Sequence, residues 1–141
     1  DGRLATDRAL RGRPFLVTFV CASCDESCGP QLQLIRGALD DVGRDIPVLA
    51  VTVQPETDTP ERARTFLLEQ YMTGRARFLL GTPRELEPVY KGFFVQRQTD
   101  EQEHHARVVL VDAEGFQRVG YNLESSTSEN IAHDIGVLEK K

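Results

Sequence analysis

The chain has 141 residues, of which 40% are hydrophobic and 28% are charged, and its formal net charge is -5. This length suits one folded domain with its own core, and the composition excludes a disordered tail. The acidic balance, without a basic run, argues against a nucleic-acid partner, because phosphates require a clustered basic surface. The longest apolar run, residues 15–22, is too short to cross a bilayer.

The first half of the chain alternates between predicted strands and helices. A polar lead-in segment, residues 1–13, precedes the run Phe15–Cys21, which is apolar on both faces as in a central strand. A helix with an apolar stripe is expected over Gln31–Val42, and a buried strand over Ile46–Val53. These elements predict parallel strands joined by a helical crossover.

The next segment predicts two helices with clear starting signals. Thr59 is expected to cap a helix that has Pro60 in its first turn and runs to about Met72. A short strand is expected over residues 78–80. Thr82-Pro83 then begins another helix, which ends near residue 92.

The last part predicts a hairpin and a closing helix. Residues 94–105 are polar and are expected to form a loop. Strands over 107–111 and 116–121 flank a glycine-containing turn at 112–115, and a helix is expected over Ser126–Leu138. The whole pattern predicts a single α/β domain over 1–141 with a thioredoxin-like fold: a mixed central sheet flanked by helices, a helical insertion and a late β-hairpin.

The three cysteines lie together at positions 21, 24 and 28, which is too local for a disulfide scaffold and favours metal or redox chemistry. Cys24 and Cys28 stand between a strand and a helix, where the first-turn amides stabilise thiolates. Thiolates are the nucleophile of disulfide exchange and the ligands that Cu(I) prefers. Cys21 continues the strand and is expected in the core, although a third ligand or a resolving thiol is the alternative.

The three histidines differ in their surroundings. His133 lies on the polar side of the last helix and is expected to be solvated. His104 and His105 precede a strand that is expected to be central, so one of them could reach the cysteines. A neutral imidazole would complete a site with two thiolates.

At this point the sequence resembles the Sco/SenC family, from about Gly12 to Tyr121. The resemblance rests on C-x-x-x-C at Cys24–Cys28, on V-Q-P-E-T-D-T-P at Val53–Pro60, on G-T-P at residues 81–83 and on V-Y-K-G-F-F-V at residues 89–95. The family histidine stands eight residues before the Asp or Gly of a turn. Counting back from Asp112 reaches His104, with His105 in reserve.

The resemblance implies that copper, as Cu(I) or Cu(II), is bound by Cys24, Cys28 and His104. It implies a metallochaperone that assists assembly of the dinuclear copper centre of cytochrome c oxidase subunit II, either by handing over copper or by reducing that subunit's thiols. The first route needs no enzyme, whereas the second would be a thiol–disulfide reductase activity. Another copper protein or other copper chaperones are further expected partners. The expected location is outside the cytoplasm, in the periplasm or on the outer face of the bacterial cytoplasmic membrane, through an N-terminal anchor that this sequence does not include. The mitochondrial intermembrane space is the alternative.

The sequence departs from the family pattern at several positions. The usual Pro after each cysteine is replaced by Asp25 and Gly29, and an aromatic residue is replaced by Cys21. Gln54 replaces a family Asp, which weakens a role for that carboxylate in partner docking. These departures bear on the partner more than on the metal site.

Three other functions compete with copper delivery. A thiol–disulfide oxidoreductase would use Cys24 to attack and Cys28 to resolve, but the spacer has three residues and no Pro stands just before Arg107. A peroxiredoxin-like peroxidase would require a Pro at a set position before its reactive cysteine, and this sequence has no Pro there. A zinc site formed by Cys21, Cys24, Cys28 and His104 would be closed and structural. The three-residue spacer between Cys24 and Cys28 and the missing Pro before Arg107 favour copper binding over thiol–disulfide exchange.

Overall fold

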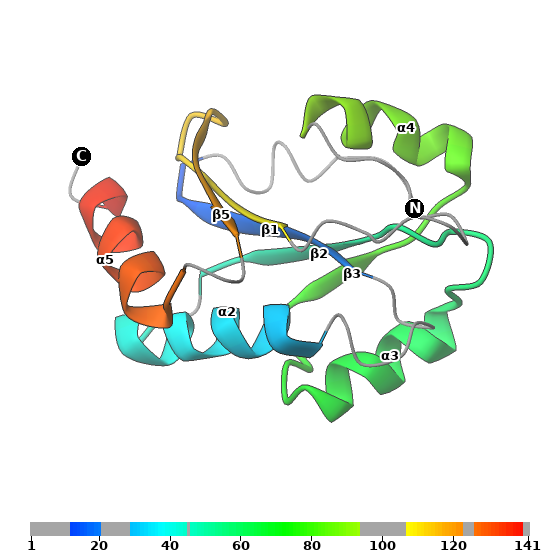
Figure 1. Ribbon diagram of the computed structural model, residues 1–141, viewed down its shortest axis with the longest axis horizontal. Coiled ribbons are helices and arrows are strands. Elements are labelled where there is room, and N and C mark those ends of the chain that lie inside the picture. The colour runs from blue at the N-terminus through cyan, green and yellow to red at the C-terminus, as the bar shows by residue number, and fades with distance from the viewer. Residues whose placement is uncertain (1–11, 21–28, 45, 94–106, 123–125, 140–141) are drawn as a thin grey trace.

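The computed structural model describes residues 12–20, 29–44, 46–93, 107–122 and 126–139. The elements in these ranges, labelled in Figure 1, are β1 (Phe15–Val20), α2 (Gly29–Val42), β2 (Val48–Thr52), α3 (Pro60–Glu69), β3 (Arg77–Leu79), α4 (Pro83–Gly92), β4 (Arg107–Val111), β5 (Gln117–Asn122) and α5 (Ser128–Glu139). Their order confirms the predicted alternation and the late hairpin. The predicted loop at 94–105 and most of the lead-in segment lie outside the described residues.

The five strands form one mixed sheet in the order β3-β2-β1-β4-β5. β1 is parallel to β2, and β2 is parallel to β3. β4 pairs antiparallel with β1 and forms a hairpin with β5. The parallel strands are joined by helical crossovers, and β4 and β5 are joined by a tight turn; this is the mixed sheet that the sequence predicts.

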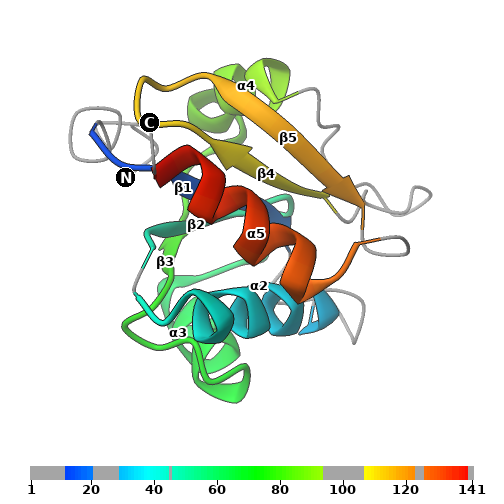
Figure 2. The same cartoon turned by 90° about the vertical axis from the view of Figure 1, so that its left-hand side faces the viewer.

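Helices cover both faces of the sheet. In Figure 1, α4 lies on one face, and α2 and α3 lie on the other; Figure 2 shows α5 beside α2. The two neighbours are joined where the Ser128 hydroxyl donates to the Leu34 carbonyl at 2.8 Å. Gly37 permits this approach, because a Cβ there would lie 2.3 Å from the Ser128 Oγ.

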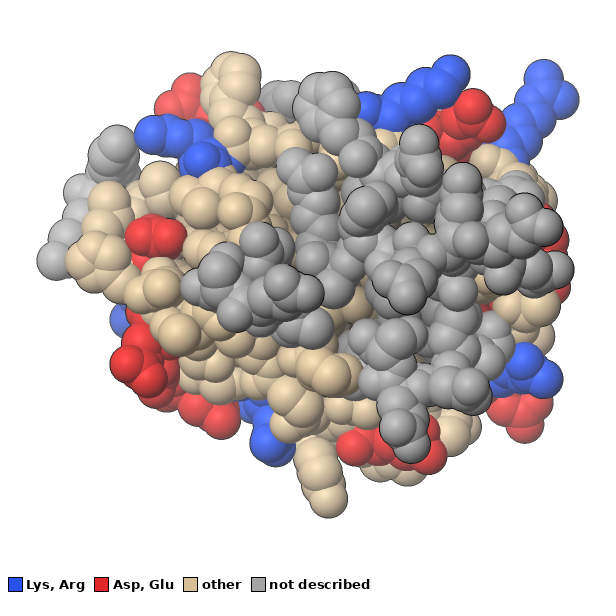
Figure 3. All heavy atoms as spheres, viewed as in Figure 1, with Lys and Arg blue, Asp and Glu red and all other residues tan. Residues whose placement is uncertain are grey.

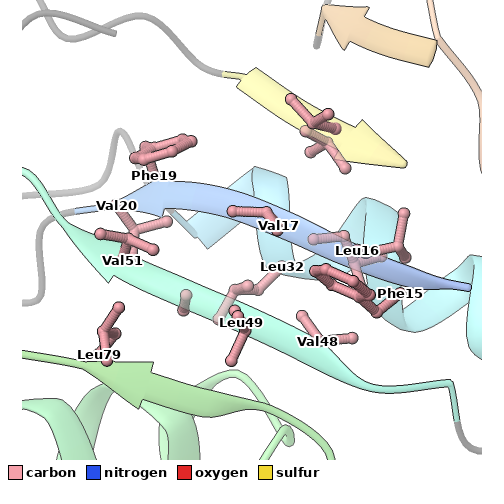
Figure 4. Close-up of a cluster of buried hydrophobic side chains, with 14 of the residues drawn as sticks. Phe15, Leu16, Val17, Phe19, Val20, Leu32, Val48, Leu49, Val51 and Leu79 are labelled. Atoms are coloured by element: carbon pink, nitrogen blue, oxygen red, sulfur yellow. The ribbon is translucent and has the colours of Figure 1, made fainter. Parts of the chain in front are cut away.

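β1 is the centre of the hydrophobic core. All six of its residues are buried, as the continuous apolar run predicts. Figure 4 shows its side chains next to those of β2. The stripe of α2, including Leu32, Ile35 and Leu39, is buried, and so are Ile131 and Ile135 of α5. The sheet is therefore packed against apolar helix faces, as the helical spacing indicates.

The two predicted helix starts are confirmed by their hydrogen bonds. The Thr59 side chain accepts from the backbone of Arg62, at the start of α3. At the start of α4, Thr82 and Glu85 form a reciprocal capping box. Both helices begin with a proline, as the sequence predicts.

The end of α3 differs from the prediction. The helix ends at Glu69 rather than near Met72, because Tyr71 adopts a left-handed conformation with φ 58°. The backbone N–H of Met72 then donates to the Leu67 carbonyl at 2.8 Å, which closes the helix. This turn places Met72 in the core and leaves Tyr71 exposed. In the described ranges, no helix combines the length and apolar character needed to span a membrane.

Candidate metal-site end of the sheet

The topology determines where the predicted site segments join the fold. Residues 21–28 connect the end of β1 with the start of α2, and residues 94–106 lead from α4 to the start of β4. Thr18 of β1 pairs with Val108 of β4, and the strands are antiparallel. β4 therefore begins beside the point where β1 ends. We call this end of the sheet, where β1 ends and β4 begins, the site end. Both segments are attached to it.

The predicted ligands themselves lie outside the described residues. These are Cys21, Cys24, Cys28, His104 and His105. Their mutual positions therefore stay a prediction. Among the residues that the structure does describe, no group of three or more His, Cys, Asp and Glu side chains is placed to hold a metal ion. His133 is exposed on α5, which confirms its predicted solvation.

A buried amide joins the end of β1 to the first turn of α2. Gln31 is fully buried, and its Nε2 donates to the Thr18 hydroxyl at 2.8 Å and to the Phe19 carbonyl at 3.1 Å. The Thr18 side chain is also fully buried. These bonds satisfy polar groups that burial would otherwise penalise. They connect the two elements between which the cysteine segment runs.

A second polar cluster lies at the end of β2. The Thr52 hydroxyl donates to the buried Asp58 carboxylate at 2.6 Å and accepts from the Gln54 backbone N–H at 3.0 Å. The Gln54 carbonyl accepts from the backbone N–H groups of Thr57 and Asp58. These bonds form a compact turn over 54–58. The Gln54 position, where the family has Asp, thus contributes through its backbone to a local turn.

Aromatic side chains at the end of α4 cover the same end of the sheet from the other face. The Tyr90 hydroxyl donates to the Thr52 carbonyl at 2.5 Å. Phe19 of β1 is fully buried, with its ring centroid 6.4 Å from that of Tyr90 and 5.5 Å from that of Phe93. Tilted aromatic pairs of this kind add to the free energy gained by burial. The ends of β1 and β2 are therefore held from both faces.

These buried hydrogen bonds at the site end were not predicted from the sequence. Their signals were present: Thr18 and Thr52 are hydroxyls in apolar strands, and Gln31 stands one helical turn before Ile35 on the buried side of α2. A polar residue at a core position indicates a specific hydrogen-bond partner. The identity of that partner depends on which elements pack together, so the pairing could not be predicted.

The charge distribution agrees with the composition. Figure 3 shows basic and acidic side chains interspersed among the described residues of the face seen in Figure 1. The drawn charges of either sign do not gather into one large area on that face.

Comparison with known proteins identifies the family. A family model described as SCO1/SenC matches residues 1–138. A curated relative, "Protein SCO1 homolog 1, mitochondrial" of Arabidopsis thaliana, is 25% identical over 107 residues, which cover 73% of this chain and 31% of the relative. The chain thus spans less than a third of that relative's length.

Solved structures show the same fold. The structure of Bradyrhizobium japonicum ScoI with copper bound is 24% identical, with a TM-score of 0.70 and coverage of 94% of this chain and 88% of that chain. A SCO1/SenC family lipoprotein from Bacillus anthracis is 21% identical, with a TM-score of 0.81 and coverage of 94% and 84%.

A third structure, of BsSco, is described as a member of the Sco family of cytochrome c oxidase assembly proteins with a disulfide switch. It is 22% identical, with a TM-score of 0.80 and coverage of 94% and 84%. These likenesses confirm the predicted thioredoxin-like α/β fold, and the family model covers nearly the whole sequence. The chain belongs to the SCO1/SenC family.

Proposed function

We propose that this chain is a copper-binding metallochaperone that assists the assembly of cytochrome c oxidase. The observation that carries the proposal is that, in a chain of this family, the segments with the predicted cysteine and histidine ligands attach to one end of the sheet. Related proteins support the metal: the Bradyrhizobium ScoI structure contains copper. The description of BsSco supports the assembly role.

The proposed ligands are Cys24, Cys28 and His104. Thiolate and imidazole donors suit copper, and soft thiolates favour Cu(I) in particular. Three protein ligands would leave a coordination position open to a recipient's ligand. Copper is then cargo that passes by ligand exchange, and no small substrate is turned over. His105 is the reserve ligand, and Cys21 is a less favoured one.

The proposed recipient is cytochrome c oxidase subunit II, or another copper protein, with other copper chaperones as donors. An extracytoplasmic location fits these partners: the periplasm or the outer face of the bacterial cytoplasmic membrane, or alternatively the mitochondrial intermembrane space. The Bacillus anthracis relative is a lipoprotein, and the Arabidopsis relative is mitochondrial. A membrane anchor outside the described residues would hold the domain near the recipient.

Copper titration tests the ligand assignment. Reduced wild-type protein and the variants Cys24→Ser, Cys28→Ser, His104→Ala and His105→Ala are titrated with Cu(I) against a competing chelator, and with Cu(II) by absorption. High-affinity binding at one copper per chain is expected in the wild type and in His105→Ala, and its loss is expected in the other three.

The adjacent histidine is the matched control, because it differs from the proposed ligand by one position. Loss in His105→Ala with full binding in His104→Ala would move the ligand by one residue. Full binding in both cysteine variants would overturn the proposed site. Circular dichroism and urea unfolding show whether each variant is folded, so that loss of binding is assigned only to folded protein.

A second function, thiol–disulfide exchange, is favoured by the disulfide switch described for BsSco. The Cys24 thiolate would attack a partner disulfide, which releases one partner thiolate and leaves a mixed disulfide. Cys28 would then displace the second partner thiolate and form a Cys24–Cys28 disulfide, so the partner gains two electrons. Cys28→Ser is expected to trap the mixed disulfide with an oxidised CxxxC peptide, and Cys24→Ser is not.

A further inference from the structure

The first turn of α2 contains a primary amide at a core position. Gln31 is fully buried, as are Leu32 and Ile35 on the same helix. Removing an amide from water is unfavourable unless its hydrogen bonds are replaced. A leucine at this position would bury a similar side chain without that cost. Packing alone therefore does not account for the amide.

Two hydrogen bonds of Gln31 lead to the same part of β1. Its Nε2 reaches the Thr18 hydroxyl at 2.8 Å and the Phe19 carbonyl at 3.1 Å, both on the last part of β1. In the described residues, the pairing of β1 with β4 extends as far as Thr18 and Val108. The Phe19 carbonyl, one residue further, accepts from the helix. The amide thus connects α2 to the strand close to the point where β1 ends.

We propose that Gln31, together with Thr18, is a positioning pair for copper binding: it holds the first turn of α2 at a set distance and orientation from the end of β1. Residues 21–28 run between these two elements, so the pair determines where that segment begins and ends. The inference rests on the proposed function. It adds two residues that are not metal ligands. They act by fixing the backbone of β1 and α2, between which the cysteine ligands are attached.

The physical reason is that hydrogen bonds are directional, whereas apolar contacts are not. Apolar contacts tolerate small rotations and shifts of a helix, whereas a hydrogen bond weakens steeply when its geometry changes. A bond from the helix to the strand therefore narrows the range of positions that the helix start can adopt. Metal affinity depends on such preorganisation, and residues that support ligands typically change it by about 10–100-fold.

The test compares variants that remove the hydrogen bonds with variants that only loosen the core. Gln31→Leu and Thr18→Val remove the amide and the hydroxyl, while Thr18→Ser keeps the hydroxyl and deletes a methyl group. Ile35→Val deletes one methylene from the next turn of α2, in an equally buried site. Each is measured by urea unfolding, by Cu(I) competition titration and by the Cu(II) absorption spectrum.

Gln31→Leu is expected to weaken Cu(I) binding about tenfold and to shift the Cu(II) absorption bands. Thr18→Val changes both in the same direction and by less, because the bond to Phe19 remains. The double variant binds no more weakly than Gln31→Leu alone, since the Thr18 hydroxyl acts on copper binding through its hydrogen bond with Gln31. Thr18→Ser and Ile35→Val keep wild-type copper affinity and spectrum even where their unfolding midpoints fall.

Copper affinity that follows the unfolding midpoint across all the variants would overturn the inference, because the pair would then act on stability alone. Unchanged affinity and spectrum in Gln31→Leu would also overturn it. Neither result contradicts the proposed function, which requires only that wild-type protein binds copper through its cysteines and histidine. Wild-type protein that binds no copper would instead contradict the proposed function, and with it this inference.

Discussion

The buried polar groups at the two ends of the sheet find their hydrogen-bond partners at different distances along the chain. At the site end, the bonds of Gln31 to Thr18 and of Tyr90 to Thr52 join elements that are 13 and 38 residues apart in the chain. At the other end, the turn between β4 and β5 lies beside the start of β1, because Val111 pairs with Phe15. There the buried polar side chain is Asp112, whose hydrogen-bond partners Glu114, Phe116 and Arg118 lie within six residues of it.

The hydrogen bonds of the Asp112 carboxylate in this turn come from neighbouring residues. The Asp112 carboxylate accepts from the backbone N–H groups of Glu114 and Phe116, both at 2.9 Å, and from the Arg118 guanidinium at 3.2 Å. Gly115 supplies the left-handed conformation, with φ 95°. Local bonds of this kind define a hairpin whatever packs around it. Long-range bonds exist only in the folded domain, so the site end depends on the whole sheet being assembled.

The largest contrast is expected between two phenylalanines. Phe19→Ala at the site end removes a fully buried ring and should lower the free energy of unfolding by about 3–5 kcal/mol. Phe116→Ala in the hairpin removes a ring that is 65% exposed and should change it by less than about 0.5 kcal/mol. Urea unfolding measures both. Equal losses would show that the hairpin is as integral to the core as β1.

A smaller effect is expected from a single hydroxyl. Tyr90→Phe removes the donor to the Thr52 carbonyl and leaves that buried group with one bond fewer, which should cost about 1–3 kcal/mol. Tyr71→Phe makes the same chemical change on a side chain that is 73% exposed and should leave the unfolding free energy unchanged. If both variants unfold at the same urea concentration, the long-range bond contributes nothing measurable.

The smallest effect is a pH dependence in the hairpin. Burial raises the pKa of the Asp112 carboxyl, but hydrogen bonds from Phe116, Arg118 and Glu114 outweigh it and hold that pKa below its usual value. The charged carboxylate therefore stabilises the fold above its unfolded pKa of about 3.9, and this contribution is lost as the pH falls through the lower folded pKa.

Unfolding free energies of wild type and Asp112→Asn at pH 7 and pH 3 measure this contribution. The wild type should lose more stability on acidification than the Asn variant, which lacks the titrating group. Glu87→Gln, on the exposed surface of α4, is the control and should follow the wild type. Identical pH dependence in all three proteins would contradict a role for the Asp112 charge.

Much of the fold was predictable because its signals are local. Continuous apolar runs predicted β1 and β2, and Thr-Pro pairs predicted the starts of α3 and α4, where the caps are formed by neighbouring residues. The end of α3 was not predictable in the same way. Nothing in its composition requires Tyr71 to take a positive φ, and the turn forms because Met72 is drawn into the core.

The candidate site shows the same division. The sequence alone determined the chemical types at the site, namely two cysteines at a strand-to-helix junction and a histidine before a strand, and it determined the family resemblance. Only the tertiary structure decided that both segments attach to one end of the sheet, because that depends on β4 pairing antiparallel with β1. It also decided that Gln31 meets Thr18, since a buried polar side chain acquires its partner only when helix and strand pack together.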